Sequence, residues 1–201
     1  MFLTPMTHRR LALLLLAAVG FGATVLAGTR ALHAQAPGAA TPPVRPVADV
    51  DIDRYVGRWY EIARFPNRFQ KKCTGNVSAV YSRRPDGRID VRNSCTTADG
   101  HTETSGIARR ADRKGPPSVL EVRFAPAILS FLPSVWGDYW ILDLSDDYDT
   151  AVVGSPDREY LWFLARTPSV DQATFARMTE AARAQGFDVD RLERTRQDAA
   201  Q

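Results

Sequence analysis

Two cysteines are the side chains in this sequence that are best suited to forming a covalent bond. Cys73 and Cys95 are the only cysteines among the 201 residues. A thiol pair can form a disulfide, hold a metal ion together with other ligands, or exchange electrons. A metal site would need more ligands, and redox use would need a close cysteine pair beside an activating group, so the sequence favours a structural disulfide. Closing the loop between them would stabilise a fold by about 3 kcal/mol in the chain-entropy model.

Groups for acid–base or nucleophilic catalysis are few. His101 is the single histidine after the first 36 residues, and it follows Gly100 at the expected start of a strand, where we expect it to be exposed. Asp146 and Asp147 are adjacent carboxylates between two expected strands, a position typical of turn formers. The sequence shows no Ser-His-Asp set, no cluster of metal ligands and no phosphate-binding loop. We therefore predict a protein that is not an enzyme and that has neither cofactor nor metal.

Residues 1–36 have the pattern of a signal peptide. A basic segment, His8 to Arg10, precedes the apolar run Leu11 to Val19, and small residues offer cleavage points after Ala27 or near Ala34 to Ala36. The alternative is a permanent membrane anchor, because the apolar stretch can be extended to Leu26. The densest part of the run is short for a span of about 20 residues. Export with cleavage is therefore the expectation.

The same segment bears on lipid attachment. Val25 to Thr29 resembles a bacterial lipoprotein cleavage site, but Thr29 stands where the lipid-carrying cysteine is required. We therefore expect an exported, soluble protein of the periplasm without a lipoprotein anchor. An oxidising compartment also strengthens the expectation of a disulfide between the two cysteines.

The charge of the chain does not indicate a nucleic-acid partner. The sequence has 26 Lys and Arg against 23 Asp and Glu, and its pI is about 9.1. Arg9, Arg10 and Arg30 account for this excess, because they lie in residues 1–36 and that segment contains no acidic residue. The remainder of the chain is balanced and shows no basic footprint. Nucleic-acid binding is therefore excluded from the expected functions.

Most of the chain shows the alternation of β-strands. Residues 37–49 are rich in Pro and Ala and predict a disordered linker, residues 50–194 predict one folded domain, and residues 195–201 predict a flexible tail. Short strands with hairpin-length connections indicate an all-β meander, either a sandwich or a closed barrel. The expected strands are 57–65, 77–82, 89–94, 101–110, 118–124, 137–144, 150–154 and 159–166.

One helix is expected after the last strand. Ser169 and Gln172 have the spacing of a capping box, and Gly186 stands where a helix would stop. Phe175, Met178 and Ala182 form an apolar stripe at helical spacing. We expect this stripe to pack on the outer wall of the sheet.

Three separated motifs resemble the short signatures of the lipocalin family. The first is Gly57-Arg58-Trp59 in the first strand, the second is Asp146-Asp147-Tyr148 before the seventh strand, and the third is Arg166 at the end of the eighth. The segments WYEIARF and REYLWFLARTP are similar to those of bacterial lipocalins, which also resemble apolipoprotein D. The order and spacing of the motifs agree with this family over about residues 50–194.

The resemblance implies an eight-stranded antiparallel up-and-down β-barrel with one C-terminal α-helix packed on its outside. Trp59 would plug one end of the barrel, and the Arg166 guanidinium would lie over its indole, a contact of about 1–2 kcal/mol when desolvated. The turn that carries Tyr148 would lie at the same end. The expected structural signature is Gly57, Trp59, Asp147, Tyr148 and Arg166.

The barrel interior is where a ligand would bind. Eight strands enclose room for one small molecule, unless the side chains meet and fill it. Glu61 shares the face of Trp59 and could hydrogen-bond a polar group or an Arg near the closed end. The face is apolar and aromatic with a few polar tips, which suits an acyl chain. The expected lining residues are Ala63, Ala79, Tyr81, Val91, Asn93, Val122, Phe124, Tyr139, Ile141, Tyr160 and Trp162.

The segment 125–136 is unusually apolar for a connection between strands. Its large apolar side chains either fold over the cavity as a lid, or make transient contact with a membrane, or meet a second subunit. They are Ile128, Leu129, Phe131, Leu132 and Trp136. The expected function is binding and carriage or storage of a fatty acid or lysophospholipid for maintenance of the cell envelope. The alternatives are a lipocalin-fold enzyme acting on a lipid or carotenoid-like substrate, and an interaction protein with a filled barrel.

Overall fold

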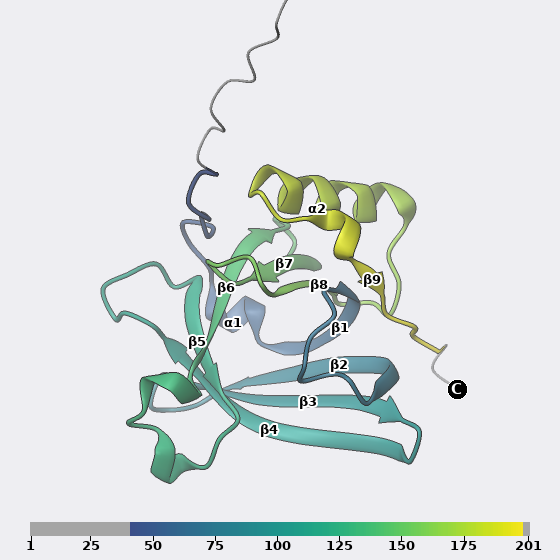
Figure 1. Ribbon diagram of the computed structural model, residues 1–201. Coiled ribbons are helices and arrows are strands. Elements are labelled where there is room, and N and C mark those ends of the chain that lie inside the picture. The colour runs from purple at the N-terminus through teal and green to yellow at the C-terminus, as the bar shows by residue number, and fades with distance from the viewer. Residues whose placement is uncertain (1–40, 199–201) are drawn as a thin grey trace, which may run out of the picture. The chain divides into compact units, whose positions relative to one another are not determined.

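The computed structural model describes residues 41–198, whose strands form one antiparallel sheet (Figure 1). Each strand from β2 to β8 pairs with its neighbours in the chain, β8 pairs with β1, and β1 pairs with β2. The sheet therefore closes into an eight-stranded up-and-down barrel, as predicted, with a short extra strand on β1. The strands are β1 (Gly57–Arg64), β2 (Cys73–Arg83), β3 (Ile89–Thr97), β4 (Gly100–Arg110), β5 (Val119–Arg123), β6 (Gly137–Leu144), β7 (Thr150–Gly154), β8 (Leu161–Ala165) and β9 (Glu193–Arg194).

Alternation along the strands creates two apolar clusters, one inside the barrel and one on its outer wall. Trp59, Val91 and Leu120 belong to the inner cluster. Phe163 and Leu142 belong to the outer cluster, which they form with the helix α2 (Gln172–Ala184). Figure 1 shows α2 beside the edge of the barrel that β7 and β8 form. The helix therefore covers one part of the wall and leaves the interior to the strands.

Helix α2 packs as predicted, but it begins later than its sequence suggested. Met178 and Ala182 are buried in the outer cluster, and the ring of Phe175 lies 5.5 Å from that of Phe163. Asp171, not Ser169, is the N-cap: its carboxylate accepts a hydrogen bond from the Thr174 amide at 2.7 Å. A carboxylate at this position satisfies an amide that the first turn leaves free and also faces the positive end of the helix dipole.

Gly186 ends α2 as the sequence predicts. Its φ is +82°, a left-handed conformation that favours glycine, and its amide donates to the carbonyl of Arg183. A Cβ at this position would also lie 2.8 Å from Thr41. The residue therefore both stops the helix and makes room for the segment that precedes the barrel.

A β-bulge in β1 reverses the expected direction of Ala63. The register with β8 shifts between Glu61 and Ala63, so that Ala63 pairs with Phe163 on the outer wall. Ala63 is fully buried in the cluster with α2 and does not face the interior. Strict alternation from Trp59 predicted that Ala63 faces the interior. This prediction was wrong because a bulge adds one residue and so reverses the direction of the side chains beyond it.

Both segments next to the barrel are more ordered than their composition suggested. Val44 is buried in the outer cluster, the Val47 amide donates to the carbonyl of Ile141, and the Ser118 hydroxyl donates to the carbonyl of Val47. The part of the expected linker from residue 41 onward therefore packs on the barrel, because its valines find apolar partners. Residues 1–36, predicted to be a signal peptide, lie outside the described residues.

The segment after β9 also contacts the barrel, although it was predicted to be flexible. β1 and β2 pair with each other only as far as Tyr60 and Ser78. Beyond that point the C-terminal segment lies between them and hydrogen-bonds to both strands. The Gln197 amide group donates to the carbonyls of Glu61 and Val77, both at 2.8 Å. One side chain thus bridges the two strands where the sheet would otherwise be open.

Short helices complete the described chain. α1 (Ile52–Tyr55) precedes β1, the 3-10 helices η1 (Ala127–Leu129) and η2 (Pro133–Val135) lie between β5 and β6, and η3 (Val189–Arg191) follows α2. Between residues 41 and 198, no helix is both long and apolar enough to cross a membrane.

Candidate ligand-binding site

The barrel encloses a cavity of about 630 Å³. Its wall includes inward-facing residues of the strands, together with residues of the connections 65–72, 124–136 and 155–160. These three connections lie at one end, where β1 finishes and β2 and β6 begin, so they form the mouth. The volume falls in the range of small-molecule sites, and the barrel is not filled by its own side chains.

The structure places most of the expected lining residues around the cavity. Ile141 is an exception: it is fully buried in the inner apolar cluster but does not reach the cavity. Ala63 is the other exception, because of the bulge in β1. The expected residues that line the cavity are Ala79, Tyr81, Val91, Asn93, Val122, Phe124, Tyr139, Tyr160 and Trp162.

Several lining residues were missed from the sequence. Leu120 shares the alternation of Val122 and could have been found by that signal. Tyr55 lies in α1, a four-residue helix whose only signal is the Asp51 cap, and Gln70 lies in an irregular connection that carries no periodic signal at all. Positions outside regular strands therefore account for the residues that sequence reasoning could not reach.

The closed end of the barrel is built on Trp59 and Arg166. The Trp59 side chain is fully buried, and its indole nitrogen donates to the carbonyl of Tyr55 at 2.8 Å. The Arg166 guanidinium lies 3.8 Å from the centre of the Trp59 ring and donates to the carbonyls of Arg54, Tyr55, Arg58 and Tyr148. One side chain therefore joins α1, β1 and the turn before β7 beneath the indole.

The backbone conformation and the close approach of Arg166 explain why residue 57, two residues before Trp59, is a glycine. Its φ is +103°, and a Cβ at this position would lie 3.3 Å from a guanidinium nitrogen of Arg166. Glycine both adopts this conformation without strain and leaves the guanidinium its place against the backbone.

The turn before β7 contributes Tyr148 and Asp147. The Tyr148 hydroxyl accepts a hydrogen bond from the Asp51 amide, and the Arg54 guanidinium lies 3.9 Å from the centre of its ring. Asp147 accepts from the Ser145 hydroxyl and the Asp149 amide, and these hydrogen bonds hold the pKa of its carboxyl below the usual value. Both residues therefore shape the turn and the closed end, not the cavity wall.

Three tyrosines meet inside the cavity toward the closed end. The Tyr139 hydroxyl lies 2.8 Å from that of Tyr55 and 3.1 Å from that of Tyr81. The Tyr55 ring also packs 5.0 Å from the Trp59 ring, between the indole and the cavity. The surface that a ligand would meet at the floor is therefore phenolic, and Trp59 supports it from behind.

A buried carboxylate lies on the wall nearer the mouth. Glu61 is 3 % exposed, and its two oxygens accept hydrogen bonds from the Gln70 amide and the Thr195 hydroxyl, both at 2.5 Å. Arg64 Nε lies 3.3 Å from Glu61 Oε1 without forming a hydrogen bond, so their contact is Coulombic. Burial raises the pKa of Glu61, and the two hydrogen bonds and Arg64 oppose that rise.

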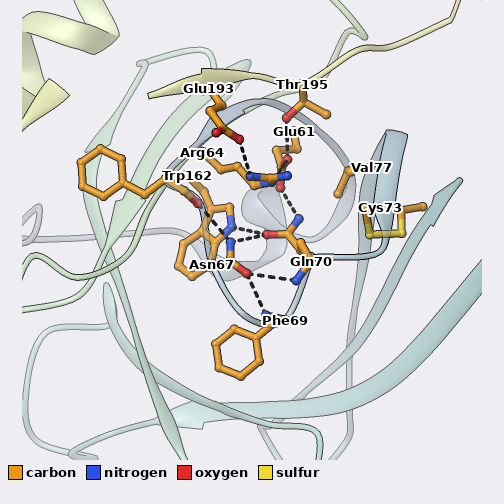
Figure 2. Close-up of polar contacts among 12 residues, drawn as sticks. Glu61, Arg64, Asn67, Phe69, Gln70, Cys73, Val77, Trp162, Glu193 and Thr195 are labelled. Atoms are coloured by element: carbon orange, nitrogen blue, oxygen red, sulfur yellow. Dashed lines mark hydrogen bonds and ion pairs between the residues drawn. A yellow bond between two sulfur atoms is a disulfide. The ribbon is translucent and has the colours of Figure 1, made fainter. Parts of the chain in front are cut away.

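Figure 2 shows that Gln70 links this carboxylate to Trp162 on the neighbouring strand β8. Its amide nitrogen donates to Glu61, while its amide oxygen accepts from the Trp162 indole at 3.0 Å and from Asn67 at 2.7 Å. The network fixes the connection between β1 and β2 over one edge of the cavity. Gln70 therefore positions the mouth and supplies little free hydrogen-bonding capacity itself.

The two cysteines form the predicted disulfide. Cys73 and Cys95 are bonded, their Cα atoms are 5.7 Å apart, and both line the cavity near the mouth. The bond joins the start of β2 to β3, next to the gap between β1 and β2. Such a bond is typical of exported proteins, and here it holds β2 to β3 beside that gap.

The mouth carries exposed apolar side chains. Ile128 and Phe131 in the β5–β6 connection are 79 % and 75 % exposed, and Phe69 in the β1–β2 connection is 65 % exposed. Ile128 and Phe131 do not line the cavity, so they do not close it as a lid, whereas Phe69 lines its rim and packs 5.7 Å from the Tyr160 ring. Trp136 is held differently: its ring packs 3.8 Å from the Arg109 guanidinium, and its nitrogen donates to Ser130.

The residues considered for catalysis do not gather at the cavity. His101 is exposed on β4, and Asp146 and Asp147 lie in the turn at the closed end. Within residues 41–198, no three His, Cys, Asp or Glu side chains are grouped closely enough to hold a metal ion. The chemistry available at the site is apolar contact with a few hydrogen-bonding groups.

Comparison with known proteins relates the chain to a single family. The family described as Lipocalin-like domain matches residues 50–197. Temperature-induced lipocalin-1 of Arabidopsis thaliana is 40 % identical over 152 residues, which cover 75 % of this chain and 81 % of the relative. Outer membrane lipoprotein Blc of Escherichia coli K12 is 36 % identical over 170 residues, covering 84 % and 92 %.

Solved structures agree at the level of the fold. Apocrustacyanin C1 superposes with a TM-score of 0.59 at 17 % identity, covering 75 % of this chain and 81 % of that one. At this identity the likeness concerns the barrel and carries no information on the ligand.

Proposed function

The chain belongs to the lipocalin family, and we propose that it binds one small hydrophobic ligand, such as a fatty acid or lysophospholipid, and stores or carries it. We propose that the protein thereby contributes to the maintenance of cell-envelope lipids. The observation that supports the proposal most is the apolar cavity of about 630 Å³ with one open end. A filled barrel would favour an interaction protein, and a constellation of catalytic groups would favour an enzyme.

The shape of the cavity favours entry of a ligand through the mouth. Trp59 and Arg166 close the far end, so a long molecule must enter from the side of Phe124 and Tyr160. Burying an acyl chain against Val91 and Val122 contributes about 0.8 kcal/mol per CH₂ group. A long chain therefore has ample driving force, even after several kcal/mol of association cost.

Location in the periplasm as a soluble protein is part of the proposal. The disulfide and the signal-like residues 1–36 support export, and Thr29 at the position of a lipid-carrying cysteine supports release without a lipid. Metabolic labelling with a tagged fatty acid tests this. We expect no covalently attached label on the protein after denaturation and removal of bound lipid, and no need for detergent to release the native protein; covalent label would overturn the soluble form.

The mouth is proposed to dock transiently on a membrane with anionic headgroups. Phe69, Ile128 and Phe131 offer exposed apolar contacts, while Arg68, Lys71 and Lys72 stand exposed around Phe69. Apolar tips among basic residues fit an anionic interface, and the same end admits the ligand.

Vesicle flotation tests the docking. We expect binding to phosphatidylglycerol vesicles that weakens with salt and is lost in an Ile128→Ser/Phe131→Ser variant, whereas phosphatidylcholine vesicles bind less. Equal binding of the variant, or none by the unmodified protein, would contradict docking through the mouth. Because the substitutions lie on the surface, thermal unfolding should be unchanged.

Native mass spectrometry tests carriage itself. Protein from an oxidising compartment is titrated with hexadecanoic acid and with a lysophospholipid. We expect one ligand per chain. Absence of any adduct, with the disulfide intact, would contradict the proposed function.

A further inference from the structure

The tyrosine cluster at the closed end has a hydrogen-bonding capacity that the protein does not use. Three phenol groups, those of Tyr55, Tyr81 and Tyr139, make two contacts with one another. Each phenol has one proton to donate, so at most two of the three protons can be shared inside the cluster. Among residues 41–198 no other hydrogen-bond partner of these hydroxyls occurs. At least one O–H donor therefore remains for a molecule in the cavity.

All three phenols keep their protons. Burial raises the pKa of Tyr81 to about 12 and raises those of Tyr55 and Tyr139 well above the usual value. The cluster is consequently a donor at any physiological pH. A buried donor without an acceptor costs free energy. A ligand atom that accepts a hydrogen bond from this O–H group therefore stabilises the complex more than the same hydrogen bond would in water.

The charge around the cluster selects the kind of acceptor. Among the described residues that line the cavity, Arg68 is the only Lys or Arg, and it lies at the mouth. Arg166 lies behind Trp59, and backbone carbonyls already occupy its guanidinium. Glu61 on the wall adds a negative group of its own. An anion at the floor would lose its water without gaining a cation, whereas a neutral oxygen would not suffer this cost.

We propose that Tyr55, Tyr81 and Tyr139 form a subsite for a neutral oxygen acceptor at the inner end of the ligand, such as a carbonyl or hydroxyl group. This inference rests on the proposed function and narrows its ligand class. The preferred ligand is a long apolar molecule that carries an oxygen at the end it buries, not one that ends in a bare methyl group. A plain acyl chain still enters, but it leaves the phenolic donor unpaired.

Matched ligands test the subsite. Hexadecanoic acid and 15-oxohexadecanoic acid have the same headgroup and chain length and differ by one carbonyl near the buried end, and shorter and longer pairs cover the depth of the cavity. Each competes with a lipophilic fluorescent probe, on the unmodified protein and on a Tyr55→Phe/Tyr81→Phe/Tyr139→Phe variant. Removing all three hydroxyls leaves no unpaired partner behind, so the variant is expected to fold, which circular dichroism and thermal unfolding verify.

The preference for the oxo acid over the plain acid is the measured quantity. We expect this preference to fall about tenfold or more in the triple variant for at least one chain length. The same preference in both proteins at every length, with plain acids bound normally, would overturn the subsite and leave the carrier function intact. Failure of every ligand and of the probe to bind would overturn both.

Discussion

The Arg166 side chain holds several elements of the closed end together. Its guanidinium makes hydrogen bonds to carbonyls of α1, β1 and the turn before β7, and it covers the Trp59 indole at 3.8 Å. The planar fork of a guanidinium suits several carbonyls at once, which an ammonium group cannot reach together. The residue is thus a structural one, distant from the mouth through which a ligand would enter.

Replacing Arg166 should therefore affect stability more than ligand affinity. We expect Arg166→Ala to lower the free energy of unfolding by about 2–4 kcal/mol, and Arg166→Lys to recover only part of it. Arg183→Ala, which removes an exposed ion pair with Glu180, should change it by less than about 0.5 kcal/mol. Urea unfolding measures all three. Equal stability of the Arg166→Ala and Arg183→Ala variants would contradict this role.

Glu61 contributes to the pH dependence of the free energy of unfolding. Burial raises its pKa in the folded protein above the usual 4.5. The folded state therefore binds this proton more readily than the unfolded state, and the contribution of Glu61 is lost as the pH rises through the raised pKa. We expect Glu61→Gln, which has no such proton, to lose less stability over that rise. The pH dependence of urea unfolding compares the two proteins; parallel curves would refute the prediction.

At the scale of elements, the barrel is closed by parts that are not regular strands. β1 and β2 separate beyond Tyr60 and Ser78, and the segment after β9 bridges the gap between them, while the disulfide ties the start of β2 to β3 beside this gap. The bulge in β1 lies at the same place, where it turns Ala63 outward to α2. The seam between β1 and β2 is therefore held by the C-terminal segment, and the disulfide fixes the β2 side of it to β3.

Gln197 offers a direct test of this seam. We expect Gln197→Ala to lower the free energy of unfolding by about 1–2 kcal/mol, because two backbone carbonyls lose their donor. Hydrogen exchange should also become faster in residues 73–77. Arg196→Ala is the matched control, since the neighbouring contact to Asn76 uses the backbone carbonyl of residue 196 and survives the change. Equal exchange in both variants would show that the seam does not depend on Gln197.

At the scale of the whole molecule, the sequence predicted the barrel, the position of the helix and the disulfide. The strands, the helix and the disulfide depend on alternation, helical spacing and cysteine count, which are repeated or unambiguous signals. Closure of the strands into a barrel was implied by the resemblance of three motifs to the lipocalins. The details that it missed depend on single events: a bulge that reverses Ala63, a cap at Asp171 in place of Ser169, and the short helix that carries Tyr55. A period-two pattern contains no information about where one residue is inserted.

The flanking segments were missed for a related reason. Composition indicated a disordered linker over 37–49 and a flexible tail from 195, because neither segment is periodic. Val47 and Gln197 nevertheless find partners on the barrel, which only the folded structure supplies. The sequence predicted Tyr81 and Tyr139 in the cavity wall, but not that their hydroxyls meet, nor that Tyr55 joins them, because the three residues come from β2, β6 and α1.

The central claim is that the ligand lies inside the barrel, and titration with a lipophilic fluorescent probe at neutral pH tests it most directly. Val122→Asp places an unpaired charge on the cavity wall, whereas Ser105→Asp places the same charge on the exposed face of β4. We expect the unmodified protein and Ser105→Asp to take up the probe and release it to fatty acids, and Val122→Asp to bind neither. Absence of uptake by the unmodified protein, or unchanged uptake by folded Val122→Asp, would contradict the account.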